Sequence, residues 1–322
     1  MNRIHYYRRV VSSYLLRKNS QLSFWHEEPE INPDAVEDAV GPYYMTFAGK
    51  ARYEGPFDDE GVPFLDYHGK IGRQYNPIAI AQYALANYNL AVKGETKRWD
   101  VFLTNARWLL NNRVANGKGL LLWPHHFDFE YFRLLKAPWF SGLAQGQGLS
   151  VLVRAYAETK DPAYLAAAEE VFRSLALPIE DGGVLHRDPE GYCWIEEYIV
   201  TPPTHILNGF IWALWGVHDY YLLTRSDEAR GLFEACTKTI VDNLRRYDNG
   251  FWSLYEMTPL RFKNIASTYY HRLHIAQLEI MYHLTDEDRF RVYSAKWKAY
   301  QDRVFNRSAA QVFKVAFKLT HY

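Results

Sequence analysis

The segment WIEEYIVTPPTHILNGF (194–210) places two adjacent carboxylates and a tyrosine ahead of a Pro-Pro turn. Because proline fixes φ and keeps the preceding residue extended, these side chains stay out of the helix that follows. Glu196 and Glu197 then point to opposite sides, so one could face a cleft while the other faces solvent. Carboxyl and phenol groups can give and take protons, so the segment is a candidate for acid–base chemistry, with a charged surface loop as the alternative.

A second group of polar aromatic side chains lies in FWSLYE (251–256) and NIASTYYHRLHIAQLE (264–279). Its members are Tyr255, Tyr269, Tyr270, His271 and His274. A lone tyrosine at the start of a helix, as Tyr270 is expected to be, more often packs than reacts. Tyr198, Tyr255 and Tyr270 nevertheless all map to the same end of the helical array described below, which favours a shared site.

Two further motifs bear on metal and nucleotide binding. HHFDFE (125–130) offers His125, His126, Asp128 and Glu130, but a metal site needs three or four convergent ligands and the chain supplies no second cluster. We therefore expect a solvated loop or a groove rim here and no bound metal. GLAQGQGLS (142–150) follows no strand and lacks the third glycine of a dinucleotide fingerprint, so no cofactor is expected. Its small residues predict a close approach of a neighbouring backbone or of substrate near Gln147.

The elements that position these motifs repeat along the chain. Apolar helical stretches begin near Pro77, Ser141, His205 and Tyr270, roughly 64 residues apart, and each is followed by a second helical stretch with one charged face. These second stretches span 98–112, 162–176, 227–246 and 288–303. Such a period is typical of an array of helical hairpins. Helices that are apolar all round are buried and one-sided helices lie outside them, so the pattern predicts a mainly α fold, an (α/α) toroid of about four hairpins.

The remaining segments divide the chain further. Residues 1–40 are expected to hold one basic amphipathic helix and an arm, 41–76 a small β-hairpin region, 77–305 the (α/α) barrel, and 306–322 a C-terminal tail. Three long connections, at 113–140, 178–204 and 247–268, carry the candidate motifs. Long structureless connections inside a compact domain are usually functional.

Composition narrows the classes of function. The 322 residues carry 37 basic and 37 acidic side chains, so no overall charge attracts nucleic acid or an anionic membrane. No stretch reaches the length of a membrane span and no clear signal peptide is seen, so a cytoplasmic location is the default. Cys193 and Cys236 are expected to be free, buried thiols. Aromatic residues make up 16% of the chain, which suits a bulky core and a groove that stacks on sugars.

Six segments resemble, in order, the C-terminal catalytic region of D-glucuronyl C5-epimerases. They are YNPIAIAQYALANY (75–88), WLLNNR (108–113), APWFSGLAQGQGLSVLVRAYAETKD (137–161), EEYIVTPPTHILNGF (196–210), LYE (254–256) and YHRLHIAQL (270–278). The resemblance implies an (α/α) barrel with a smaller β part, a homodimer, and conversion of D-glucuronate to L-iduronate within a polysaccharide or oligosaccharide. The large β-sheet domain that animal members hold between the first two of these segments is missing here.

Carried over residue by residue, the resemblance implies catalytic roles for four side chains: Glu197, Tyr198, Tyr255 and Tyr270. Tyr198 and Tyr270 would transfer protons at C5 on opposite faces, Tyr255 would assist, and Glu197 would be an alternative base or would orient Tyr198. The reaction also needs groups that bind the uronate and stabilise an enolate-like intermediate. Candidates for binding are Arg261, Asn264, His271, Arg272, Gln147 and Glu196.

Three other functions remain open from the sequence. A polysaccharide lyase begins with the same C5 proton abstraction and then expels the C4 oxygen, giving an unsaturated product. A glycosidase needs two carboxylates across a sugar, which Glu197 with Asp128 or Glu256 could supply. A non-catalytic glycan-binding module would bind uronate polymers without exchanging the C5 proton with solvent.

Overall fold

The computed structural model describes residues 22–67, 69–131 and 133–321, and within them it forms four helical hairpins. The first helices of the pairs are α3 (Pro77–Val92), α5 (Gly142–Thr159), α7 (Leu207–Thr224) and α9 (Thr268–Thr285). Their partners are α4 (Arg98–Asn111), α6 (Pro162–Ala176), α8 (Asp227–Asn243) and α10 (Asp288–Asp302). The predicted repeat is confirmed, whereas the helix expected in residues 1–20 lies outside the described residues.

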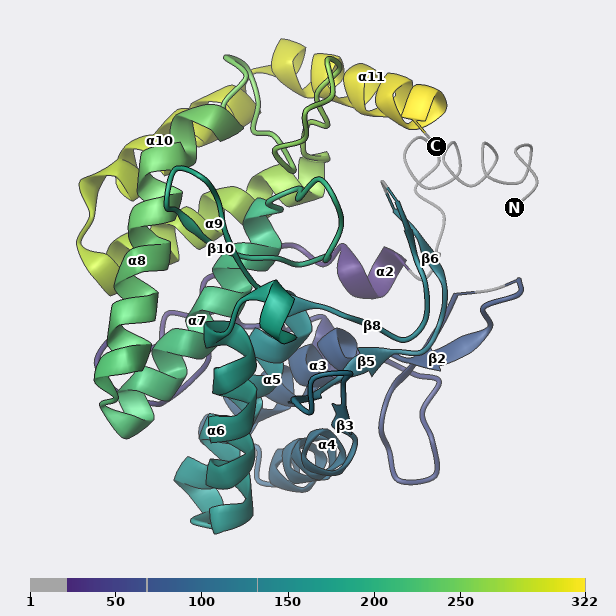
Figure 1. The fold of residues 1–322 in the computed structure, drawn as a ribbon, viewed down its shortest axis with the longest axis vertical. Helices are drawn as coiled ribbons and strands as arrows, with labels where there is room; N and C mark the ends of the chain where they lie inside the picture. Colours follow the sequence, from purple (N-terminus) through teal and green to yellow (C-terminus); the bar gives the residue numbers. More distant parts are fainter. Residues whose placement is uncertain (1–21, 68, 132, 322) are drawn as a thin grey trace.

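The hairpins form two layers. Inner helices α3, α5, α7 and α9 contact one another in chain order, and each outer helix packs on the inner helix of its own hairpin, toward the outside of the molecule (Figure 1). Helices α3, α5 and α7 are buried along nearly their whole length, whereas α4, α6 and α8 bury one face only. Burial on all sides is what apolar residues all round a helix require. The fold is therefore mainly α, an (α/α) toroid.

The same turn joins the helices of three hairpins. Each of α5, α7 and α9 ends on a residue with a left-handed backbone, and the next residue caps the outer helix with its side chain. The pairs are Lys160–Asp161, Arg225–Ser226 and Asp286–Glu287. Asp and Ser are among the best helix N-caps, because their oxygens accept from backbone N–H groups of the first turn. The repeated turn keeps the hairpins alike in length.

Small antiparallel hairpins fill the connections. The pairs are β1 (Phe64–Asp66) with β2 (Arg73–Tyr75), β3 (Val114–Ala115) with β4 (Leu121–Leu122), β5 (Pro124–His125) with β8 (Trp139–Phe140), β6 (Phe129–Glu130) with β7 (Leu134–Leu135), and β9 (Leu185–Arg187) with β10 (Cys193–Ile195). The expectation that 113–140 and 178–204 are structureless was wrong. Short strands that pair only locally carry little periodicity in the sequence.

The small β-hairpin expected within 41–76 is present as β1–β2. The segment YYMTFAGKARY (43–53) forms no hairpin, because it packs into the barrel, and Met45 makes an isolated bridge with Ile31. Tyr43 and Tyr44 are fully buried, and Lys50–Arg52 form the short 3-10 helix η1. The Tyr44 hydroxyl donates to Asp219 Oδ1 at 2.8 Å, and Arg154 bonds the same carboxylate at 2.6 and 3.2 Å. This buried ion pair joins α5 to α7 near their carboxyl-terminal ends, at the opposite end from Tyr270.

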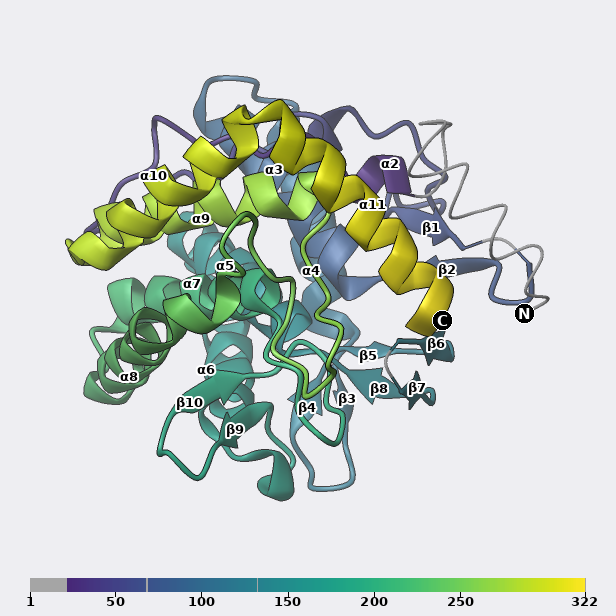
Figure 2. The ribbon, with the colours of Figure 1, turned by 90° about the horizontal axis from the view of Figure 1, so that it is seen from above.

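The chain ends in a helix. Residues 306–322, set apart as a tail from the sequence, are helical to His321 as part of α11 (Val304–His321). Figure 2 shows α11 lying across the molecule, and α11 contacts α9 and α10. The described residues begin with the short helix α2 (Leu22–Trp25). Both cysteines are free and buried, as expected. Within the described residues no helix has the length and apolar composition needed to cross a bilayer.

Gly146 gives the clearest test of the inner layer. A Cβ added at Gly146 would lie 2.2 Å from the Ala213 Cα, because the backbones of α5 and α7 meet here. We expect Gly146→Ala to lower the free energy of unfolding by about 1–3 kcal/mol, the usual cost of overpacking. Gly231 of α8 has no atom within 4 Å of such a Cβ, so Gly231→Ala should be neutral or stabilising by up to about 1 kcal/mol. Urea unfolding of both variants measures this, and equal stabilities would contradict the close contact.

Candidate active site

The start of α9 brings two of the predicted tyrosines together. Ser267 caps the helix and accepts from the backbone N–H of Tyr270 at 3.3 Å, which places Tyr270 in the first turn. The rings of Tyr255 and Tyr270 lie edge to face, with centroids 4.8 Å apart. Tyr255 is fixed by its backbone, which donates to the Asn264 carbonyl at 2.9 Å and accepts from Leu207 N–H at 3.3 Å. The loop before α9 is therefore tied to the start of α7.

Tyr198 joins this cluster from the connection before α7. Its ring contacts Phe129, Tyr131 and Trp139 at centroid distances of 5.8, 4.6 and 5.6 Å. Burial raises the pKa of Tyr198 well above its usual value, and negative charge on Glu197 or Tyr270 raises it further. The phenol also hydrogen-bonds to Glu197. At neutral pH Tyr198 is therefore a protonated phenol that can donate.

Glu197 is a buried acid that precedes α7 in the chain and packs against the first turn of that helix. A Cβ on Gly209 would lie 2.0 Å from Glu197 Oε2, so only glycine leaves room for this carboxyl. Burial raises the pKa of Glu197 to about 8, opposed by the hydrogen bond with Tyr198. A carboxyl with this pKa is mostly protonated at neutral pH, which suits orientation of Tyr198 better than proton abstraction.

Glu196 does not face solvent and does not face the tyrosines. Its Oε1 lies 2.5 Å from His205 Nδ1, and its Oε2 accepts from the His205 backbone N–H at 3.2 Å. The imidazole also stacks on Trp194 at 4.2 Å. Both glutamates are buried, so the expected split between cleft and solvent was wrong. Glu196 holds the turn that leads into α7 and is not retained as a substrate-binding group.

A hydrogen-bonded chain lies beside Tyr255. Tyr131 donates to Glu256, Asn264 Nδ2 donates to Glu256 Oε1 at 3.0 Å, and Lys314 Nζ donates to Asn264 Oδ1 at 2.7 Å. These residues come from the β6–β7 hairpin, the loop before α9, and α11. Burial raises the pKa of Glu256. Burial, with the nearby Lys318 charge, lowers the pKa of Lys314 to about 7. The predicted residue Asn264 thus lies in the centre of a buried polar chain.

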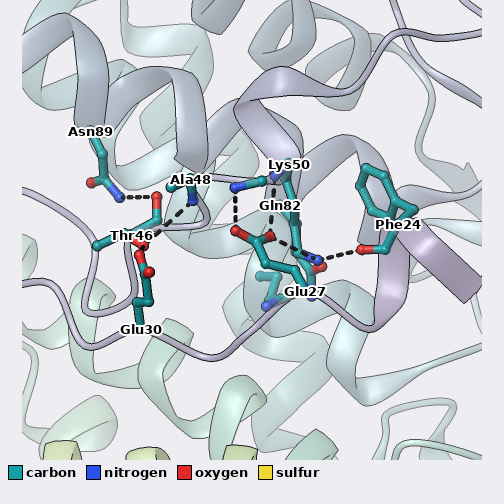
Figure 3. Close-up of polar contacts among 10 residues, drawn as sticks. Phe24, Glu27, Glu30, Thr46, Ala48, Lys50, Gln82 and Asn89 are labelled. Atoms are coloured by element: carbon teal, nitrogen blue, oxygen red, sulfur yellow. Dashed lines mark hydrogen bonds and ion pairs between the residues drawn. The ribbon is translucent and has the colours of Figure 1, made fainter. Parts of the chain in front are cut away.

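The segment after α2 covers the start of α9. The His26 ring lies 4.9 Å from Tyr269 and 5.9 Å from Tyr270. Glu27 anchors the segment, because its carboxylate accepts from the backbone of Gly49 and Lys50 while the Lys50 ammonium donates to the Phe24 carbonyl at 2.6 Å (Figure 3). Burial lowers the pKa of His26 to about 4, with Lys50 and Lys314 contributing. His26 is therefore neutral above that pH.

Two predicted binding residues lie in other surroundings. His271 is fully buried: its Nδ1 lies 2.8 Å from Ser253 Oγ, its Nε2 lies 3.0 Å from the Trp297 carbonyl, and its ring stacks on Trp252. His271 therefore fixes α9 to the loop at Ser253 and to Trp297 of α10, and these contacts do not favour a role in binding substrate. Gln147 is buried between α5 and α3, where it accepts from Gln82 at 3.0 Å.

The two predicted arginines are closer to the surface. Arg272 donates to Glu28 at 2.5 Å, so it helps to hold the segment after α2. Arg261 is exposed on the loop between Glu256 and Asn264. Of the two, only Arg261 remains a candidate for binding an acidic ligand.

The HHFDFE motif folds as part of two small hairpins. His125 is buried and stacks on Trp139 at 3.8 Å, whereas His126, Asp128 and Glu130 are exposed. Asp128 pairs with Lys136 at 2.5 Å. Among the described residues, no group of three or more His, Cys, Asp or Glu side chains could hold a metal ion.

Two surface depressions lie away from the tyrosines. One of about 720 Å³ lies between α7, α8 and the α9–α10 turn, and one of about 680 Å³ lies between the β1–β2 hairpin and α4. Neither is lined by Tyr198, Tyr255 or Tyr270.

The sequence reasoning missed several neighbours of the tyrosines, above all His26, Tyr131 and Lys314. Their local sequences carry no motif, and Lys314 lies in the segment expected to be a tail. The strong amphipathic pattern of 304–321 was the one signal that could have placed a helix there.

The family comparison agrees with the order of the motifs. The family model described as D-glucuronyl C5-epimerase C-terminus matches residues 117–299, more than half of the chain. A D-glucuronyl C5-epimerase of Caenorhabditis elegans is 28% identical over 332 residues, covering 90% of this chain and 53% of its own. An uncharacterized protein of Methanocaldococcus jannaschii is 31% identical over 181 residues, covering 55% of this chain and 57% of its own.

Solved structures give weaker likenesses. The cellobiose 2-epimerase of Spirochaeta thermophila matches with a TM-score of 0.48 and 13% identity, covering 75% of this chain and 70% of that one. The unsaturated glucuronyl hydrolase of Bacillus sp. GL1 matches with a TM-score of 0.47 and 16% identity, covering 70% and 61%. At these scores the likeness carries no argument about activity.

The fold is an (α/α) toroid with buried carboxyl groups and partly buried phenols at one end. The chain belongs to the D-glucuronyl C5-epimerase C-terminal family. It spans about half the length of the curated relatives it matches.

The raised pKa of Glu197 predicts a pH dependence of stability. Its folded-state pKa, about 8, lies above the ordinary value of 4.5, so the protonated carboxyl favours the folded state. This contribution is complete below about pH 4.5 and is lost as the pH rises toward 8. We expect the free energy of unfolding of wild type to fall relative to Glu197→Gln across that window. Urea titrations at several pH values measure the difference. Glu130→Gln, at an exposed position, is the control, and parallel curves for wild type and Glu197→Gln would contradict the burial of this acid.

Proposed function

We propose that this protein epimerises D-glucuronate residues of a polysaccharide or oligosaccharide to L-iduronate at C5. Family membership supports this reaction, and the observation that carries it is the cluster of Tyr198, Tyr255 and Tyr270 at one end of the toroid. A non-sulfated, heparosan-type or heparan-type glycosaminoglycan is the substrate class that the motifs favour. This route needs no nucleotide, because C5 is inverted by the loss and return of a proton, and the adjacent carboxylate holds the electron pair in between.

The chemistry needs two proton-transfer groups on opposite faces of C5. A phenolate takes the C5 proton, and the electron pair of the broken C–H bond moves into the adjacent carboxylate. A phenol on the other face then gives its proton to C5. Each turnover leaves the two phenols with exchanged protonation states, which proton exchange with solvent restores. Tyrosine can serve in both roles when its surroundings tune its pKa.

The surroundings suggest a division of roles. Tyr198 is a phenol with a strongly raised pKa, and a mostly protonated Glu197 holds it in place. We therefore assign to Tyr198 the role of donating a proton to the intermediate formed from glucuronate. Tyr270 is assigned the base role, with Tyr255 packed against it at 4.8 Å and assisting. Arg261 is proposed to meet the uronate carboxylate from the exposed loop. Charge on that carboxylate must be neutralised before the weakly acidic C5–H can ionise.

Turnover in D₂O tests the reaction. With glucuronate-containing oligosaccharides and no added nucleotide or metal, we expect deuterium at C5 and new iduronate signals in the NMR spectrum. Accumulation of an unsaturated uronate would instead establish the lyase. Binding of the oligosaccharide without any deuterium at C5 would leave only the glycan-binding module.

Tyr270→Phe tests the base. The change removes one oxygen and keeps the packing volume, so the melting temperature should hardly move. The rate of C5 exchange should fall by at least about 10²-fold, the scale of general acid–base catalysis. Tyr269→Phe removes the same atom from the neighbouring ring and serves as the control, with a smaller loss expected. Near wild-type turnover in Tyr270→Phe would make another group the base, with Glu197 the first alternative.

We also propose that the enzyme is a homodimer that pairs through α11. Exposed Phe305, Val312 and Leu319 lie seven residues apart on this helix, with the partly buried Ala309 and Ala316 between them. Apolar residues at this spacing form the seam of a two-helix coiled coil, so a second copy of the same helix is a fitting partner. Light scattering should give twice the chain mass for wild type and the single-chain mass for Val312→Glu. A wild-type monomer would contradict the proposal.

A further inference from the structure

The ammonium of Lys314, in the middle of α11, lies within hydrogen-bonding distance of the loop that carries Tyr255. Its side chain is 5% exposed, and Nζ donates to Asn264 Oδ1 at 2.7 Å and to the Ile265 carbonyl at 2.9 Å. The same nitrogen lies 5.3 Å from the centroid of the Tyr255 ring. An ammonium within about 6 Å of an aromatic ring is attracted to it, and far more strongly once the ring carries a phenolate charge.

Among the described residues, Glu256 is the acid whose charge is shown to act on Lys314. Glu256 is buried, accepts from Asn264 and Tyr131, and has a raised pKa, so its surroundings oppose a negative charge on it. From the other elements packed around it, Lys314 meets Lys318 of its own helix, His26 of the segment after α2, and His274 of α9. These are basic groups, so none of them supplies negative charge. A buried ammonium in such surroundings strongly favours the appearance of an anion beside it.

Tyr255 is the group placed to become that anion. Its backbone is bonded to Asn264, the same residue whose side chain holds the ammonium, so the distance between the two is fixed by one short loop.

We propose that Lys314 is a positioning residue of the epimerase site, whose ammonium stabilises the phenolate of Tyr255. This inference rests on the proposed function, in which Tyr255 assists proton transfer at Tyr270. The C-terminal helix then contributes to the active site, and the pair Lys314–Tyr255 sets the pH range in which the assisting phenol can hold a negative charge.

The pair can be tested without turnover. Carbon-13 at the tyrosine Cζ reports ionisation of each phenol by NMR, and Tyr255→Phe identifies the Tyr255 signal by its loss. In Lys314→Met that signal should titrate at least about one pH unit higher than in wild type, a tenfold change in the ionisation constant. Lys314→Arg, which keeps the charge, should stay closer to wild type. Lys296→Met, which removes a lysine of α10 paired with Asp248, is the control and should leave the signal unchanged.

Activity provides a second and separate readout. The rate of C5 exchange in Lys314→Met should fall at least about tenfold near neutral pH and recover partly in more alkaline solution, whereas a purely structural loss would lower the rate equally at all pH values. An unchanged Tyr255 titration in Lys314→Met overturns the inference. If Lys314→Met does not fold, the titration of Tyr255 in Lys314→Arg decides instead. A Tyr255 signal that titrates as an ordinary exposed tyrosine, both in wild type and in Lys314→Arg, also overturns the inference. Absence of C5 exchange in wild type would defeat the proposed function while leaving the titration result to stand by itself.

Discussion

The close contact between α5 and α7 fixes the geometry on which the remaining structure depends. Gly146 and Gly216 let the two backbones approach, since a Cβ on either would overlap the other helix. The starts of both helices are thereby held at one level. Two further glycines contact the segment that carries Glu196 and Glu197. The backbone N–H of Gly142 donates to the Glu196 carbonyl at 2.9 Å, and Gly209 leaves room for the Glu197 carboxyl. Small residues in the inner helices therefore place Tyr198.

Burial of polar groups is the second constraint. Glu197, Glu256 and Lys314 are buried and Tyr198 is partly buried, and each has a pKa shifted toward its neutral form. Water is replaced by hydrogen bonds from neighbours, such as those of Tyr131 and Asn264 to Glu256. In a medium of low dielectric constant, a single charge changes the ionisation of its neighbours strongly. This arrangement suits a reaction that moves protons between weak acids.

The helical part of the fold could be predicted from the sequence, and the surroundings of the site could not. The spacing of apolar residues reports helix periodicity directly, which is why the four hairpins matched their predicted ranges. The side-chain partners were set by contacts between distant segments: Glu196 meets His205 across a turn, and Lys314 reaches Asn264 from 50 residues away. His271, a candidate for stabilising the intermediate, follows Tyr270 directly, yet one step along a helix turns a side chain by about 100°, here toward Ser253 and Trp297. Residue type alone did not reveal that direction.

The central claim is that two tyrosines act on opposite faces of C5. Deuterium incorporation from D₂O, measured separately from glucuronate-containing and iduronate-containing oligosaccharides with Tyr198→Phe and Tyr270→Phe, tests it most directly. The account predicts that both variants lose full epimerisation, and that one of them still exchanges the C5 proton of only one epimer with solvent. Equal exchange from both epimers in each variant, or epimerisation that survives either change, would contradict the claim.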